Sequence, residues 1–169
     1  MASFCAGAVV AEPFVHTMRV RYAECDAQGV VFNAHYLAYV DDTITAMWRA
    51  AFGGYDVMLG RGVDIVVAEA NLRFRGSARF DEVVAIEATV VHLGTTSLGT
   101  AYRFLRGDDR GHQRDSSDHR GDVGDHPAGE LLVEAQLRHV FVTAGTAEKT
   151  PIPGWAREGL EAWAAPLPG

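Results

Sequence analysis

Apolar and polar residues alternate along several segments of this chain, which is the spacing of a β-strand with one buried face. Between Phe14 and Tyr22, Met18 and Val20 fall on one face while Arg19 and Arg21 fall on the other. Short polar or glycine-bearing connections between such segments predict an antiparallel sheet. The other expected strands run over Val63 to Arg75, Asp81 to His92, Ser97 to Arg106 and Glu130 to Thr143.

A helical spacing replaces the alternation after the first strand. Leu37, Val40 and Ile44 recur every three or four residues, and two glycines at positions 53 and 54 end the segment. Asn33 is a suitable N-cap for this helix because its side chain can accept a hydrogen bond from a first-turn amide. The pattern predicts one long helix with a broad apolar face.

These elements indicate a single α+β domain over residues 1–169, with its core at about 14–143. The long helix is the natural cover for the apolar face of the sheet. A short C-terminal helix is expected at about 154–163, after two prolines. Residues 107–129 are almost entirely polar or glycine, so they predict a flexible insertion within a hairpin. A hydrophobic content of 48% is enough for a core without disulfides.

The charge and the distribution of apolar residues exclude several classes of protein. A net charge of −7 argues against binding to nucleic acid, which recruits clustered Lys and Arg. No run of about 18 apolar residues is present, so no membrane span is expected. The N-terminus lacks the features of a secretory signal, and Cys5 and Cys25 lie too close to that end to staple the domain. The sequence therefore predicts a protein of the reducing cytoplasm.

A tight turn is expected between the first strand and the long helix. Asp26 and Gly29 occupy the first and fourth positions of a type I turn, where these residue types are favoured. From the local sequence alone, the Asp26 carboxylate hydrogen-bonds the backbone of its own turn. A chemical role for Asp26 depends on a wider resemblance.

The stretch YAECDAQGVVFNAHY, at residues 22–36, resembles the catalytic segment of the 4-hydroxybenzoyl-CoA thioesterase family. The stretch EANLRFRGSARFDEV, at 69–83, resembles two strands of that family and their turn, and LGTTS, at 93–97, resembles the next turn. The resemblance covers about residues 14–143. It implies a hotdog fold, in which a curved antiparallel sheet wraps a long central helix. It also implies a homodimer or a homotetramer, with active sites at the subunit interface.

The resemblance further implies hydrolysis of an acyl-CoA or acyl carrier protein thioester, with Asp26 as the catalytic carboxylate. Asp26 would attack the thioester carbon or activate a water, while helix N-terminal amides near Asn33 polarise the carbonyl. Gly29 matches the glycine of the family motif. His35 stands two residues beyond the position where some members carry histidine, so it is a weaker catalytic candidate. No cofactor is expected, since coenzyme A is part of the substrate.

The expected substrate contacts lie on the catalytic turn, the helix start, the second strand and a later turn. Arg73 and Arg75 could bind the phosphates of coenzyme A, because guanidinium groups form paired hydrogen bonds with phosphate. Glu69 is a reserve carboxylate. The full set is Gly29, Val30, Tyr36, Glu69, Arg73, Arg75, Thr96 and Ser97.

Two neighbours of Asp26 also carry reactive groups. Strand alternation sends Glu24 to the same side as Asp26, which allows a carboxylate pair, although we expect Glu24 to be solvated. Cys25 would need a nearby base to form a thiolate, and we expect it to be packed instead. The histidines and aspartates of the polar insertion lack tight ligand spacing, so no metal site is expected.

Two other functions remain alternatives. A hotdog hydratase or dehydratase acting on 3-hydroxyacyl thioesters would need an aspartate and a histidine closely paired for proton transfer. Asp26 and His35 are separated by a turn in this sequence. A non-catalytic acyl-CoA-binding protein would keep the fold and the pocket, and the retained Asp26 carboxylate argues against it.

Overall fold

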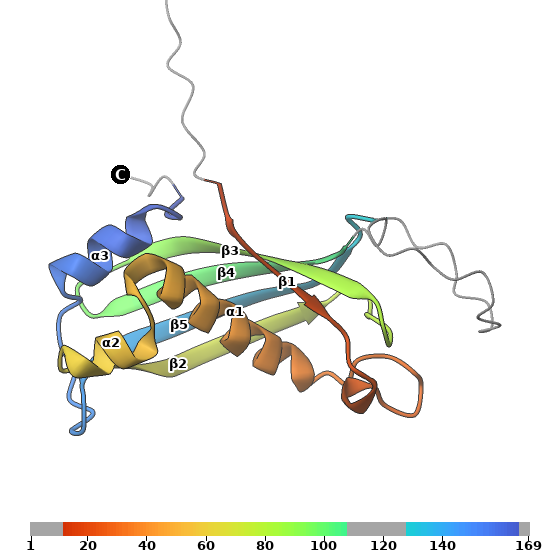
Figure 1. The fold of residues 1–169 in the computed structure, drawn as a ribbon, viewed down its shortest axis with the longest axis horizontal. Helices are drawn as coiled ribbons and strands as arrows, with labels where there is room; N and C mark the ends of the chain where they lie inside the picture. The colour runs from red at the N-terminus through yellow and green to blue at the C-terminus, as the bar shows by residue number, and fades with distance from the viewer. Residues whose placement is uncertain (1–11, 108–127, 166–169) are drawn as a thin grey trace, which may run out of the picture.

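The computed structural model describes residues 12–107 and 128–165, which form one antiparallel sheet and three α-helices (Figure 1). The five strands lie in the order β1-β3-β4-β5-β2, so β1 and β2 are the two edges. The elements are β1 (Phe14–Arg19), the 3-10 helix η1 (Tyr22–Glu24), α1 (His35–Phe52), α2 (Tyr55–Gly60), β2 (Val63–Phe74), β3 (Val83–Leu93), β4 (Ser97–Arg106), β5 (Leu131–Thr143) and α3 (Gly154–Glu161).

Helix α1 lies across one face of the sheet, here called the inner face (Figure 1). The core forms between them because both elements bury the apolar side of their sequence pattern. The inner face of β3 buries Val84, Ile86, Ala88 and Val90, as the alternation predicts. The buried residues of α1 are Tyr36, Tyr39, Val40, Thr43, Ile44, Met47 and Trp48.

The start of α1 differs from the expectation. The helix begins at His35, its N-cap is Ala34, and no side chain caps it, so the prediction of Asn33 as N-cap is wrong. Three successive amides instead donate to carbonyls three residues back, at Phe32, Asn33 and Ala34. Such tight 3-10-type bonds satisfy the first helical donors without a capping side chain. The end of α1 follows the prediction, since Gly53 adopts a φ of 96°.

The first strand is shorter than predicted. β1 ends at Arg19, because the Val20 amide and carbonyl bond instead to Glu82 and Asp81 of the turn before β3. The chain then forms η1 where alternation predicts continued strand. The remaining predicted strands are confirmed, with ends that shift by at most two residues. Most of the predicted 107–129 insertion, residues 108–127, lies outside the described residues.

The C-terminal helix α3 forms where it was predicted, and it packs against the end of α1. Leu160 is fully buried, and the Trp155 ring lies edge-on to Phe52 at 5.3 Å. α3 approaches α1 so closely that a Cβ on Gly159 would lie 2.7 Å from the Ala51 carbonyl oxygen. The short helix α2 was not predicted. No helix of the described residues is long and apolar enough to cross a membrane.

The packing of α1 on the sheet predicts how much free energy of unfolding is lost when a buried side chain is shortened. Ile44 is 0% exposed, so we expect Ile44→Ala to lower the free energy of unfolding by about 2–5 kcal/mol. The matched change Leu59→Ala, at an exposed position of α2, should cost under about 1 kcal/mol. Urea unfolding at one fixed protein concentration checks both. Equal losses at the two positions would contradict the packing described here.

Candidate active site

The predicted catalytic segment is a short hairpin that leads into α1. The Asp26 amide donates to the Val30 carbonyl at 2.9 Å, and the Phe32 amide donates to the Glu24 carbonyl at 2.9 Å. Between these two bonds, Cys25 and Val31 form an antiparallel bridge. The backbone of the segment is therefore fixed on both sides of the turn.

Asp26 stands at the start of the turn at its tip, as the sequence predicts. The Gly29 amide donates to the Asp26 carbonyl at 3.0 Å, and Gly29 has a φ of 75°. The Gln28 amide donates to Asp26 Oδ1 at 2.8 Å, which fixes the orientation of the carboxylate. The side chain is half-buried, and Asp26 Oδ2 has no protein partner among the described residues. This oxygen can therefore act on a ligand.

Glu24 lies two residues before Asp26 and is only 4% exposed, so the expectation of a solvated Glu24 is wrong. The Tyr39 hydroxyl donates to Glu24 Oε2 at 2.7 Å. Arg21 donates to the same carboxylate from its amide at 2.7 Å and from its guanidinium at 2.5 and 2.8 Å. The carboxylate is therefore occupied, and it ties the hairpin to α1 rather than pairing with Asp26.

These contacts also set the ionisation of Glu24 and Tyr39. Burial raises the pKa of Glu24, but hydrogen bonds from the Arg21 side chain and amide and from Tyr39 outweigh it, so the net pKa lies below its usual range. Burial, together with the hydrogen bond to Glu24, raises the pKa of Tyr39 far above its usual range. A charged Glu24 and a neutral Tyr39 hydroxyl are therefore the stable pair.

The turn at residues 76–82 supports the other side of the hairpin. The Val31 amide donates to the Ala78 carbonyl at 2.9 Å, and the Ala78 amide donates to the Tyr36 hydroxyl at 3.0 Å. Arg106 is buried beneath this turn, where it pairs with the carboxylates of Glu82 and, at 3.0 Å, Glu130. Tyr36, a predicted substrate contact, thus lies in the core and links α1 to this turn.

Cys25 is packed rather than activated. Its thiol is half-buried, and burial together with the nearby carboxylates of Glu24 and Asp26 raises its pKa. A raised pKa reduces the thiolate population that nucleophilic attack requires. The contacts of Cys25 therefore favour the expected packing role.

The amides just before α1 remain available to a ligand. Asn33 and Ala34 are exposed, and their N–H groups donate to no acceptor within the described part of the chain. No acidic residue stands in the first turn of α1 to neutralise its dipole. His35 is half-buried at the first helical position, with its ring 6.4 Å from that of Phe32. Asp26 and free amide donors thus belong to one hairpin.

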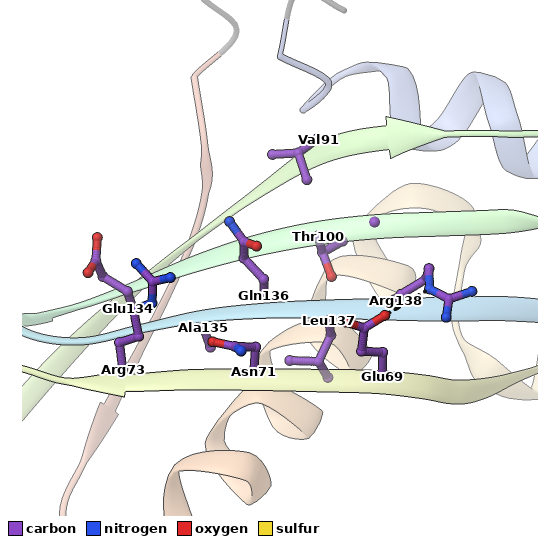
Figure 2. A pocket seen from close by; sticks show the side chains of 11 residues that line it. Glu69, Asn71, Arg73, Val91, Thr100, Glu134, Ala135, Gln136, Leu137 and Arg138 are labelled. Atoms are coloured by element: carbon purple, nitrogen blue, oxygen red, sulfur yellow. Dashed lines mark hydrogen bonds and ion pairs between the residues drawn. The ribbon is translucent and has the colours of Figure 1, made fainter.

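The predicted contacts on β2 lie on the outer face of the sheet, away from α1. Figure 2 shows Glu69 and Arg73 beside side chains of β4 and β5 in a shallow hollow of about 400 Å³. Arg138 pairs with Glu69 at 3.2 Å, and Arg75 pairs with Glu134 at 3.1 Å. Arg73 has no ion-pair partner among the described residues, which leaves its guanidinium available to an anion.

Thr96 and Ser97 belong to the turn between β3 and β4 and the start of β4. This turn lies at the opposite end of the sheet from the segment that joins β1 to α1 (Figure 1). The Asp26 hairpin rests on the turn before β3, whereas Thr96 and Ser97 follow the last residue of that 11-residue strand. A strand of this length spans roughly 35 Å at 3.3 Å per residue. A single copy of the chain therefore does not bring Thr96 and Ser97 to Asp26.

A second hollow, unexpected from the sequence, lies between α1 and the edge strand β2. It has a volume of about 370 Å³, and its lining includes Leu37, Ala38, Val67 and His139. Leu37 and Ala38 belong to the first turn of α1, so this groove begins beside the free amides at residues 33 and 34. In the sequence, His139 follows Leu137 at an inward position of its strand. A histidine among inward-facing apolar residues was the signal that could have predicted a groove here.

Comparison with known proteins identifies the family. A model of the thioesterase superfamily matches residues 28–111, about half of the chain. The match begins two residues after Asp26 and so says nothing about the role of that residue. Acyl-CoA thioester hydrolase YbgC of Escherichia coli is 28% identical over 88 residues, which are 52% of this chain and 66% of the relative.

Solved structures agree with this assignment. The hypothetical protein TT1821 of Thermus thermophilus is 28% identical, with a TM-score of 0.71 over 88% of this chain and 98% of its own. The dynemicin thioesterase is 17% identical, with a TM-score of 0.75 over 92% of this chain and 100% of its own. The five-stranded sheet lying on one long helix is the fold that these neighbours share. This chain belongs to the thioesterase superfamily and is a hotdog-fold thioesterase.

Proposed function

We propose that this protein hydrolyses an acyl-CoA thioester, or the equivalent acyl carrier protein thioester, with Asp26 as the catalytic carboxylate. The observation that carries the proposal is the hairpin that joins a half-buried Asp26 carboxylate to the unbonded amides of Asn33 and Ala34. A carboxylate and free amide donors near a helix N-terminus are the two groups that acyl transfer needs. The relative from Escherichia coli is named for the same reaction.

Two routes give the same products. In the first, an Asp26 oxygen attacks the thioester carbon, the C–S bond breaks and the thiolate leaves; water then hydrolyses the mixed anhydride. In the second, Asp26 takes a proton from a water that attacks the same carbon. The Asn33 and Ala34 amides stabilise the charge on the carbonyl oxygen in both routes. The products are a carboxylic acid and a thiol, and no cofactor is consumed.

A thioester whose carbonyl lies at this hairpin continues beyond its sulfur into a long thiol carrier, which needs contacts of its own. Arg73 offers an unpaired guanidinium on the outer face, which suits a phosphate of coenzyme A. His35, half-buried beside Phe32, can contact the acyl group or the carrier. Thr96 and Ser97 would reach a substrate at Asp26 only across a subunit interface, because they stand at the far end of their own protomer.

We also propose that two chains pair along β2. This 12-residue strand is an edge, and it exposes Val66, Val67 and Phe74. A long edge with exposed apolar side chains is a template for pairing with a second strand. Antiparallel pairing of two β2 strands would extend the sheet and bring the two grooves beside α1 to one interface. The result is a homodimer, from which a tetramer could form.

Asp26→Asn tests the catalytic assignment. The replacement amide keeps an oxygen that can accept from the Gln28 N–H, so the turn is preserved while the charge and basicity are lost. We expect kcat/KM for thiol release from acyl-CoA substrates to fall at least about 100-fold. Asp56→Asn, at an exposed position of α2 beyond the other end of α1, should leave it within about twofold. Full activity of Asp26→Asn across aromatic, short and long acyl groups would disprove the assignment.

Glu24→Gln tests whether the buried carboxylate positions Asp26. Every group that contacts Glu24 is a donor, so an amide nitrogen there would face another donor. We expect a loss of about 1–3 kcal/mol in the free energy of unfolding, and a lower kcat with little change in KM. Glu87→Gln, which removes a surface pair with Arg103, is the matched control and should cost under about 1 kcal/mol.

The pH dependence of stability provides a second measure of the same group. Since the pKa of Glu24 is lower in the folded than in the unfolded chain, its stabilisation is complete above the ordinary value of 4.5. It is lost as the pH falls from 4.5 through the folded pKa. The gap in unfolding free energy between wild type and Glu24→Gln should therefore shrink below that pH. A gap that does not change with pH would contradict a buried, charged Glu24.

Light scattering after size-exclusion chromatography tests the pairing of β2. We expect the wild type to elute at twice the protomer mass, and Val67→Lys to shift it toward the protomer, since a charge at an edge opposes strand pairing. Val67 is 56% exposed. Val15→Lys, at a 54% exposed position of the opposite edge strand β1, should stay dimeric. A monomeric wild type at high concentration would refute this pairing.

A further inference from the structure

His139 is an unusual residue in the core of this protein. It lies on the inner face of β5, only 3% exposed, between the inward-facing residues Leu137 and Phe141. Its Nδ1 is buried and has no hydrogen-bond partner in the part of the chain that the structure describes. Buried polar atoms without hydrogen-bond partners are rare in native proteins, so each one needs an explanation. The other buried carboxylate and hydroxyl groups near the site, those of Glu24, Tyr36 and Tyr39, are all hydrogen-bonded.

The place of His139 suggests the reason. The histidine forms part of the wall of the groove between α1 and β2, whose other walls are mainly apolar, with Leu37, Ile44 and Val67 among them. The groove holds about 370 Å³. An apolar cavity of about 150 Å³ already accommodates benzene, so this one has room for an aromatic ring or a medium-length acyl chain with a substituent. It begins beside the free amides that precede α1.

The chemistry of the ring fits a neutral polar ligand. Burial lowers the pKa of His139 to about 4, so the imidazole is uncharged near neutral pH and has one donor and one acceptor nitrogen. An uncharged ring in an apolar wall does not attract an anion, but it can give or accept one hydrogen bond with a hydroxyl or carbonyl group. Trp48, whose ring lies edge-on at 6.3 Å, also has a buried N–H without a partner within residues 12–107 and 128–165.

From these observations we infer that His139 selects the acyl group: the groove between α1 and β2 takes an acyl chain or ring whose hydroxyl or carbonyl substituent hydrogen-bonds to His139. The inference rests on the proposed thioester hydrolysis and adds a specificity-determining residue to it. Substrates that lack the substituent leave the imidazole unpaired inside the groove, and this penalty is the source of the selection. Asp41 is the other polar side chain that lines the groove.

A second copy of this chain is the alternative occupant of the groove, because β2 is its rim. A partner that filled the groove would make His139 an interface residue. Its substitution would then change the dissociation of the dimer and leave the choice between acyl groups untouched. An acyl group in the groove gives the reverse result, so the two occupants are separable by experiment.

The test compares pairs of substrates that differ by one hydroxyl. Benzoyl-CoA is paired with 3-hydroxybenzoyl-CoA and with 4-hydroxybenzoyl-CoA, and hexanoyl-CoA is paired with 6-hydroxyhexanoyl-CoA. We expect the wild type to prefer the hydroxylated member of at least one pair by about tenfold in kcat/KM. His139→Leu should bring that ratio to about one, chiefly by faster hydrolysis of the plain substrate, and His139→Gln should retain part of it. His16→Leu, on the opposite edge strand β1, should leave the ratio unchanged.

The outcomes separate this inference from the proposed function. A wild-type preference that survives in His139→Leu, or a wild type with no preference in any pair, overturns the role of His139 while thioester hydrolysis stands. A change in dimer dissociation without a change in the ratio overturns it as well. If no thiol is released from any substrate, the proposed function fails. The binding affinities of the same acyl-CoA pairs then decide whether His139 selects the acyl group. Selectivity in binding that is lost in His139→Leu then supports the role of His139, and selectivity that is unchanged or absent overturns it.

Discussion

The buried carboxylate of Glu24 is the constraint on which the rest of the site depends. A charge removed from water is tolerated only when hydrogen bonds replace its solvation. Here Tyr39 supplies a donor from within the core, and Arg21 supplies donors from the surface, where its own side chain keeps contact with solvent. Because these donors come from both sides, the chain must turn at Glu24. That turn directs Asp26 to the tip of the hairpin, whereas β1 has already ended at Arg19, where Val20 bonds to the turn before β3.

The hairpin is held equally firmly by the turn before β3. Tyr36 and Ala78 are 42 positions apart, and their hydrogen bond fixes the level at which α1 crosses the sheet. Arg106 neutralises the acidic residues beneath that turn, so the support of Asp26 extends from α1 through the turn to β4. A carboxylate held this way keeps its orientation without a contact from the substrate, which is the preorganisation that acyl transfer requires.

Periodicity predicted the sheet, the long helix and the C-terminal helix, because each buries one face and shows it in its spacing. The turn at Asp26 was also predictable, since its fourth residue, Gly29, adopts a positive φ that glycine favours. Glu24 and Asn33 were misread for a common reason. A carboxylate after a strand and an asparagine before a helix have standard local roles, which tertiary contacts replaced: Tyr39 reaches Glu24 across 15 positions, and 3-10 bonds satisfy the helix start.

The two faces of the sheet differ in how completely their charged and polar side chains are paired. On the outer face, the charges of Glu69 and Glu134 are largely matched by arginines, so that side gives little net attraction to an anion apart from Arg73. On the inner face, the side chains of Glu24, Tyr36 and Tyr39 are hydrogen-bonded, whereas His139 Nδ1 and Trp48 Nε1 have no partner among the described residues. Selection among acyl groups requires a polar group whose partner the substrate alone provides. In the proposed reaction, the hairpin therefore supplies groups that are already positioned, while the acyl group completes the groove beside α1.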